Sequence, residues 1–203
     1  MVVRFFTDFC EELLGTAFDV INLEQRGIGD LIQAEASRIF AQLVDAQLGF
    51  EHAEARTRRS PEDFSISHQE VFVMFDVKTH EVGAEFSMPN LISIERLWNI
   101  LEDEEEDIYY IFIDYNTDGD NATVEHVEIR HVTNLCLEDL RIGNLGKGQL
   151  QISNGANRVR DSELNPNEWM RLFVSMAVEH NESLIEVVEE RITLWQEREQ
   201  MLD

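Results

Sequence analysis

Asp63, Asp76 and Lys78 have the residue types and the spacing to bind a metal ion and to cut a phosphodiester bond. Asp76 and Lys78 follow the apolar run "VFVMF", and Asp63 lies thirteen residues before Asp76. Residues i and i+2 of a strand share a face, so Asp76 and Lys78 project together from the end of a buried strand. A partly desolvated carboxylate beside an ammonium is costly unless the two groups are paired or bind something.

Two carboxylates that meet at one end of a sheet are suited to a hard divalent cation. Asp63 starts the strand-like piece "FSISH", so a hairpin with the next strand would bring Asp63 beside Asp76. Oxygen ligands suit Mg²⁺, which stabilises charge on phosphate and lowers the pKa of bound water. Lys78 would position or activate the attacking water and neutralise developing charge. The pattern therefore predicts a phosphodiesterase site.

The tripeptide Asp-Val-Lys alone carries little information in so acidic a chain. Acidic residues number 41 of 203, so two lysines give about 0.4 chance matches to acid-x-Lys. The alternative to a catalytic role is a surface ion pair that closes the strand. However, only two of the 16 basic residues are lysines, Lys78 and Lys147. Because arginine is the usual cation of this chain, the lysine at 78 indicates that a compact ammonium is needed.

The elements that must position these residues predict one α/β or α+β domain over residues 1–203. Helical spacing of apolar residues predicts an N-terminal helix and a second helix over about 30–48. Strands are predicted at "FSISH", "VFVMF", "IYYIFIDY" and "TVEHVEIRHV". Asn90 can cap a helix that runs to Leu101. We expect a catalytic core at about 29–155 and a C-terminal part of one or two helices at about 165–203.

The stretch from Asp63 to Leu97 resembles the PD-(D/E)XK nuclease superfamily. "SPED" stands where the family has Pro-Asp, with Glu62 between Pro61 and Asp63. The stretch "FDVKTHEVGAEFSMPNLISIERL" is similar to the catalytic segment of type II restriction endonucleases of the HincII type. The resemblance implies a restriction-endonuclease-like α/β core with a central mixed β-sheet flanked by helices. It also implies Mg²⁺-dependent, site-specific cleavage of double-stranded DNA by a homodimer, in a restriction-modification system with a cognate DNA methyltransferase.

The same resemblance implies roles for individual residues. Asp63, Asp76 and the backbone of Val77 would hold the metal ion, and Lys78 would act on the water. Glu35, on the helix before the strands, would match an acidic residue that the family carries on an early helix.

Candidate DNA-contacting residues lie in a polar loop over 79–90, in the glycine-rich segment "RIGNLGKGQLQISN" and in an arginine cluster. Their side chains can reach phosphates or base edges. The structural alternatives are a helix cap at Asn90, a solvent lysine in a turn at Lys147, and arginines that neutralise an acidic surface. The candidates are Thr79, His80, Ser87, Asn90, Lys147, Gln149, Gln151, Arg158, Arg160, Arg56, Arg58 and Arg59.

The formal charge of -25 argues against tight, non-specific DNA binding at low salt. At high salt the acidic surface is screened and basic loops can still bind DNA, as in a halophilic host. Two other functions stay open. One is a repair or recombination nuclease of the same superfamily. The other is a non-enzymatic acidic DNA mimic, which would need no metal ion and no lysine beside Asp76.

The expected location is the cytoplasm. Cys10 and Cys136 are too few and too far apart for a disulfide scaffold or a zinc site. The start "MVVRFFTDFCEELLG" is interrupted by acidic residues, unlike a signal peptide. No apolar run approaches membrane-spanning length.

Overall fold

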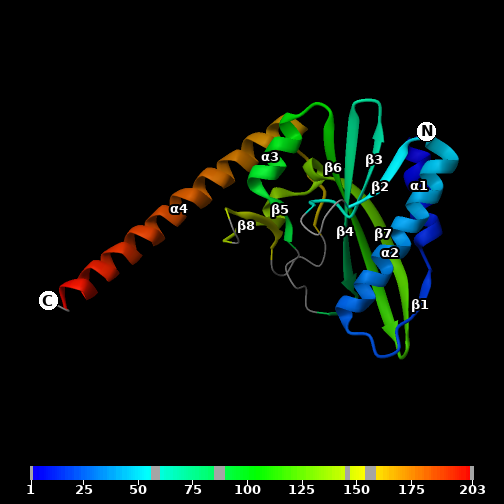
Figure 1. Ribbon diagram of the computed structural model, residues 1–203, viewed down its shortest axis with the longest axis horizontal. Coiled ribbons are helices and arrows are strands. Elements are labelled where there is room, and N and C mark those ends of the chain that lie inside the picture. The colour runs from blue at the N-terminus through cyan, green and yellow to red at the C-terminus, as the bar shows by residue number, and fades with distance from the viewer. Residues whose placement is uncertain (1, 56–59, 85–89, 145–146, 154–158, 202–203) are drawn as a thin grey trace.

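The centre of the protein is a six-stranded sheet in the order β1-β7-β6-β4-β3-β2 (Figure 1). The structure is a computed structural model and describes residues 2–55, 60–84, 90–144, 147–153 and 159–201. A second sheet of three strands has the order β5-β9-β8. The strands are β1 (Ala17–Asp19), β2 (Glu51–Glu54), β3 (Phe64–His68), β4 (Val71–Glu81), β5 (Asn90–Ser93), β6 (Glu106–Asp118), β7 (Asn121–His131), β8 (Leu140–Gly143) and β9 (Gln149–Ile152).

The large sheet is mixed, because β4 and β6 run parallel while its other neighbouring strands are antiparallel. β3 and β4 form the predicted hairpin, with a turn at Gln69 and Glu70. Gln69 adopts a positive φ of 55° in this turn. A parallel pair needs a crossover, which here contains β5 and α3 (Ile94–Glu102). The mixed sheet confirms the predicted α/β architecture.

Helices cover both faces of the large sheet (Figure 1). On one face, α1 (Val2–Leu13) and α2 (Gln25–Leu43) pack on Phe75 and Val77 of β4. On the other face, α3 and the small sheet pack on Met74 of β4. Successive residues of a strand point to opposite faces, so β4 contributes to both hydrophobic cores.

The C-terminal part is a single helix, α4 (Pro166–Gln200). Asn165 and Glu168 form a capping box at its start, as the sequence predicts. Trp169 and Phe173 pack into the second core, and the rest of α4 runs away from the body of the protein (Figure 1). None of the helices in the described ranges is long and apolar enough to cross a membrane.

Three predicted boundaries differ from the structure. The second helix lies earlier, with α2 over Gln25–Leu43 followed by a π-helical turn over Val44–Leu48. β4 continues to Glu81 because its pairing with β6 extends that far, so Thr79 and His80 lie in a strand and not in a loop. Asn90 begins β5, where it pairs with Gln151, and α3 starts only at Ile94. The prediction that Asn90 caps this helix is therefore wrong.

Candidate functional site

Asp76 and Lys78 form an ion pair on β4, at the centre of the large sheet. The Lys78 ammonium lies 2.9 Å from Oδ1 and 2.7 Å from Oδ2 of Asp76. Asp76 is only 5% exposed. Its neighbours in sequence, Phe75 and Val77, point into the α1–α2 core. The period-2 alternation thus sends Asp76 and Lys78 together to the opposite face, as predicted.

Asp63 reaches the same place from the end of β3. Phe64 pairs with Phe75, so one further step of this register sets Asp63 opposite Asp76. The Asp63 amide donates to the Phe75 carbonyl (2.8 Å), and Asp63 Oδ2 accepts from the Val77 amide (2.7 Å). The N–H and C=O of one strand residue point to the same side of the strand. The Val77 carbonyl is therefore directed to the side on which Asp63 lies.

Burial dominates the electrostatics of the Asp76 carboxylate. Burial raises its pKa to about 7, the Lys78 ammonium works in the opposite direction, and the Asp63 carboxylate raises the pKa further. Asp76 Oδ2 is buried, and the Lys78 ammonium lies 2.7 Å from it. A cation between the Asp63 and Asp76 carboxylates would stabilise the charged form of both groups.

Tyr110 lies beside Asp76, because the parallel pairing sets these two residues in register. The Tyr110 side chain is fully buried, and its hydroxyl has no hydrogen-bond partner within the described ranges. Burial, and then the Asp76 charge, raise the pKa of the phenol well above its ordinary value. The phenol is thus a neutral donor at physiological pH, next to the Asp76 carboxylate. In the sequence, nothing distinguishes Tyr110 from the other aromatic residues of "IYYIFIDY".

The register continues from β6 into β7 and creates three rows of side chains on one face. Each row takes one residue from β4, one from β6 and one from β7. The rows are Asp76–Tyr110–Arg130, Lys78–Phe112–Glu128 and His80–Asp114–His126. The His80 ring lies 3.5 Å from Asp114, and both line a hollow of about 680 Å³ with His126.

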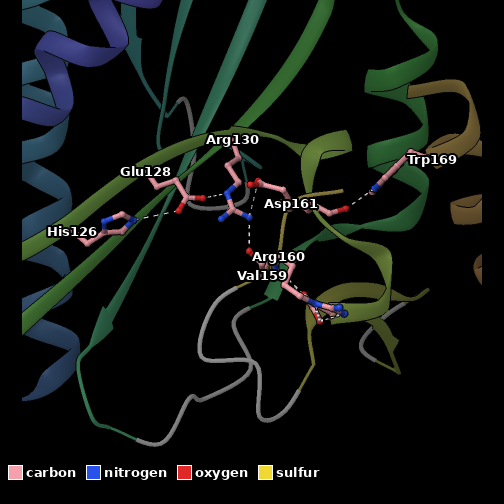
Figure 2. Close-up of polar contacts among 9 residues, drawn as sticks. His126, Glu128, Arg130, Val159, Arg160, Asp161 and Trp169 are labelled. Atoms are coloured by element: carbon pink, nitrogen blue, oxygen red, sulfur yellow. Dashed lines mark hydrogen bonds and ion pairs between the residues drawn. The ribbon is translucent and has the colours of Figure 1, made fainter. Parts of the chain in front are cut away.

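The β7 members of these rows form a polar chain that holds the segment before α4 (Figure 2). His126 lies 3.3 Å from Glu128, and Glu128 pairs with Arg130. The Arg130 guanidinium donates to the Val159 carbonyl and lies 3.6 Å from Asp161. Charged groups that are this enclosed need such partners. β7 therefore links the Asp76 face to the start of α4.

Glu35 does not join the site. Its carboxylate accepts from the Arg38 guanidinium at 2.6 and 2.8 Å, and these hydrogen bonds hold the pKa of Glu35 below its usual range. A hollow of about 350 Å³ contains Asp63, and Asp30 lines it from α2. A helix turns about 100° per residue, so Glu35 lies about 140° around α2 from Asp30. Asp30 is thus the acidic residue of α2 that lies with Asp63. In the sequence, Asp30, Gln33, Ala34 and Ser37 have the spacing of residues on one face of a helix, and this spacing is the signal that could have identified Asp30.

Two of the predicted DNA contacts are engaged in ion pairs. The Lys147 ammonium lies 3.0 Å from both carboxylate oxygens of Glu95 on α3. The Arg160 guanidinium donates to Asp139 at 2.9 Å and to Glu138 at 3.0 Å. The Lys147–Glu95 pair is mostly exposed, so it contributes little stability and can exchange for phosphate. Arg160 is held more firmly, because its guanidinium and its backbone amide both donate to the largely buried Asp139.

The predicted glutamines and Asn90 come together on the small sheet. Gln151 Nε2 donates to Asn90 Oδ1 at 2.5 Å, and Ser93 pairs with Gln149 beyond an irregularity in the β5–β9 register. Gly143 lies directly against the Gln151 side chain, since a Cβ there would meet Gln151 Oε1. Thr79 faces α2, where a Cβ at Gly29 would lie 2.8 Å from its hydroxyl. The remaining predicted contacts, Arg56, Arg58, Arg59, Ser87 and Arg158, lie outside the described residues.

The metal ligands available at this site are few. Within the part of the chain that the structure describes, no group of three or more His, Cys, Asp or Glu side chains could hold a metal ion. A cation here would therefore rely on Asp63, Asp76, the Val77 carbonyl and water. That donor set consists only of oxygen, which suits Mg²⁺ and not zinc.

Comparisons with known proteins add a structural likeness. No family model and no curated protein matches the chain. Among solved structures, the NlaIV restriction endonuclease is similar, with a TM-score of 0.49 and 14% sequence identity over 85% of each chain.

Proposed function

We propose that this protein is a cytoplasmic, Mg²⁺-dependent type II restriction endonuclease of the PD-(D/E)XK superfamily, which cleaves double-stranded DNA at a specific sequence. Its partners would be duplex DNA, a second copy of the chain and a cognate methyltransferase that protects the host DNA. The observation that carries the proposal is the convergence of Asp63, Asp76 and Lys78 at the end of one hairpin.

The donor set supports a magnesium ion at this place. The two carboxylates lie opposite each other, and Asp76 is buried with a single ammonium, that of Lys78, in contact with it in the described ranges. Two like charges in a largely buried position destabilise the fold unless a proton or a cation joins them. When bound there, Mg²⁺ supplies Lewis-acid stabilisation of the phosphate and lowers the pKa of a coordinated water.

The protein's own residues position the reacting groups and neutralise the negative charge that develops. Lys78 is largely enclosed and held by Asp76, so its ammonium is fixed where developing negative charge needs a donor. Asp76 must lose a proton before it binds a cation, and its raised pKa of about 7 places that step near neutral pH. Asp63, whose carboxylate is held by the Val77 amide, keeps a single orientation toward Asp76.

Plasmid cleavage tests this proposal. The wild-type protein is incubated with supercoiled plasmid and Mg²⁺ at low and at molar salt, with EDTA as a blank, beside Asp76→Asn and Lys78→Gln. Matched controls are Glu70→Gln, an exposed acid in the turn before β4, and Arg4→Gln, whose side chain is 86% exposed. We expect discrete fragments from the wild type and both controls, and a loss of at least about 100-fold in the two site variants.

The other outcomes separate the alternatives. Smearing or trimming of the plasmid that depends on Mg²⁺ and on Lys78 would indicate a repair or recombination nuclease of the same superfamily. Intact plasmid under every condition would contradict nuclease activity and favour the acidic DNA mimic.

A further inference from the structure

Beyond Phe173, α4 carries a stripe of apolar side chains that nothing in the described chain covers. The stripe consists of Val174, Val178, Asn181, Ile185, Val188, Ile192 and Trp195, hereafter the α4 seam. Its apolar members are between 39% and 64% exposed. Most of α4 extends into solvent away from both cores (Figure 1). A contiguous exposed apolar surface of this kind marks an interaction site.

The spacing within the α4 seam specifies the kind of partner. Its steps are four, three, four, three, four and three residues, which is a period of 3.5. A straight helix has 3.6 residues per turn, so a stripe with period 3.5 stays on one side only if two helices wind around each other. The α4 seam spans 22 residues, about 33 Å of helix. A helix with the same period is therefore the partner that fits.

The α4 seam continues into a groove between α3 and α4. The groove holds about 600 Å³, and seam residues Val174, Val178 and Ile185 line it from α4. Ile94 and Trp98 line it from α3, and Trp98 is itself partly exposed. A second helix laid along the seam would enter this groove and cover Trp98 as well.

We propose that the α4 seam pairs with the α4 seam of a second copy of this chain, as a parallel two-stranded coiled coil. The second copy supplies a helix of equal length and equal period, so the surface is self-complementary, as a two-fold dimer requires. β-branched residues occupy Val178, Ile185 and Ile192, the positions where parallel pairs favour them.

The charges beside the seam disfavour the antiparallel orientation. In a parallel pair, Glu189 of one helix faces Leu184 of the other, and Arg191 faces Gln196. An antiparallel pair with the same overlap would instead set Glu182 beside Glu189 twice, and like charges at this distance repel.

The polar seam residue also fits parallel pairing. Asn181, in the row of Val174, Val188 and Trp195, meets Asn181 of the second copy, and any other register would bury its amide against an apolar side chain. Its amide donates to the Ala177 carbonyl of its own helix, at 2.7 Å, which leaves Asn181 Oδ1 as an acceptor for the second copy.

The size of the α4 seam predicts a dimer of moderate affinity that salt strengthens. Burying an aliphatic side chain of this size removes roughly 60–120 Å² from water, so the half-exposed seam contributes on the order of 300–500 Å² per copy. A standard interface buries about 800 Å² per partner, and the groove beside Trp98 adds part of the difference. Each copy carries a charge of -25, so screening at high salt favours pairing.

Sedimentation equilibrium tests the surface. The variant Ile185→Glu/Ile192→Glu places two charges in the seam. The control Val187→Glu/Leu194→Glu places the same charges two residues further on, at apolar positions outside the seam that are 38% and 44% exposed. In 1 M salt we expect the wild type and the control to be dimers and the seam variant to be at least tenfold weaker in self-association. Circular dichroism shows that each variant is folded. A monomeric wild type up to 100 μM, or equal weakening in both variants, would overturn the proposal.

Disulfide trapping tests the orientation. Val178→Cys should cross-link with itself under mild oxidation, because parallel helices bring the two copies of residue 178 together. Cross-linking that occurs only when Val178→Cys is mixed with Trp195→Cys would overturn the parallel arrangement. The wild type, with Cys10 and Cys136, is the blank. Both experiments measure assembly, so a failure of DNA cleavage leaves their outcome unaffected.

Discussion

Replacing Asp76 with asparagine should stabilise the metal-free protein above neutral pH. The folded state raises the pKa of Asp76 from 3.8 to about 7, mainly by burial. Between these values the unfolded chain has lost the proton that the folded protein still holds. Raising the pH across this window therefore favours the unfolded state, and the full penalty is present above pH 7. Asparagine has the same shape and no proton to lose.

The magnitude follows from the pKa difference. A shift of about three units corresponds to about 4 kcal/mol above pH 7. Between pH 5 and pH 8 this destabilisation of the wild type grows by about 3 kcal/mol. Asp76 is only 5% exposed, so solvent screening reduces this free-energy penalty only slightly. The variant also leaves the Lys78 ammonium without its partner. This loss lowers the gain in unfolding free energy at every pH, but it changes the pH dependence of that gain only slightly.

Urea unfolding at pH 5, 6, 7 and 8 in EDTA and constant salt measures the effect. We expect the unfolding free energy of Asp76→Asn, relative to the wild type, to rise by about 3 kcal/mol from pH 5 to pH 8. Glu70→Gln removes one exposed carboxylate from the turn before β4 and should run parallel to the wild type.

The comparison of variants removes other sources of pH dependence. Histidines titrate in the same window, but they are present in all three proteins and cancel in the difference. A difference between Asp76→Asn and the wild type that stays within about 0.5 kcal/mol from pH 5 to pH 8 would refute the assignment of Asp76 as a buried carboxylate with a raised pKa.

Three further results are expected. Mg²⁺ should raise the thermal midpoint of the wild type more at pH 8 than at pH 5.5, because Asp76 must lose its proton first, and should leave Asp63→Asn unchanged in scanning calorimetry. Lys147→Gln should change the unfolding free energy in urea by less than about 0.5 kcal/mol, since its pair with Glu95 is exposed. Trp169→Phe should lose roughly 1–3 kcal/mol in the same assay, because the buried Leu135 carbonyl loses a donor at 2.7 Å; an unchanged midpoint would contradict this.

Local patterns in the sequence were sufficient to predict the β3–β4 hairpin and the ion pair on it. The alternation along β4 predicts that Asp76 and Lys78 share a face, and the polar step at Gln69 and Glu70 predicts the turn that returns Asp63 to them. Both relations connect residues close in sequence, where period and turn chemistry decide the geometry. The capping box of α4 is local in the same sense.

Relations between distant segments were decided only by the tertiary structure. The parallel pairing of β4 with β6 depends on a register more than thirty residues apart, and it alone sets Tyr110 beside Asp76 and Arg130 in the same row. The rotation of α2 against the sheet places Asp30, and not Glu35, with Asp63. Local periodicity does not specify strand register or helix rotation, because many packings bury the same apolar stripe and the whole core selects among them.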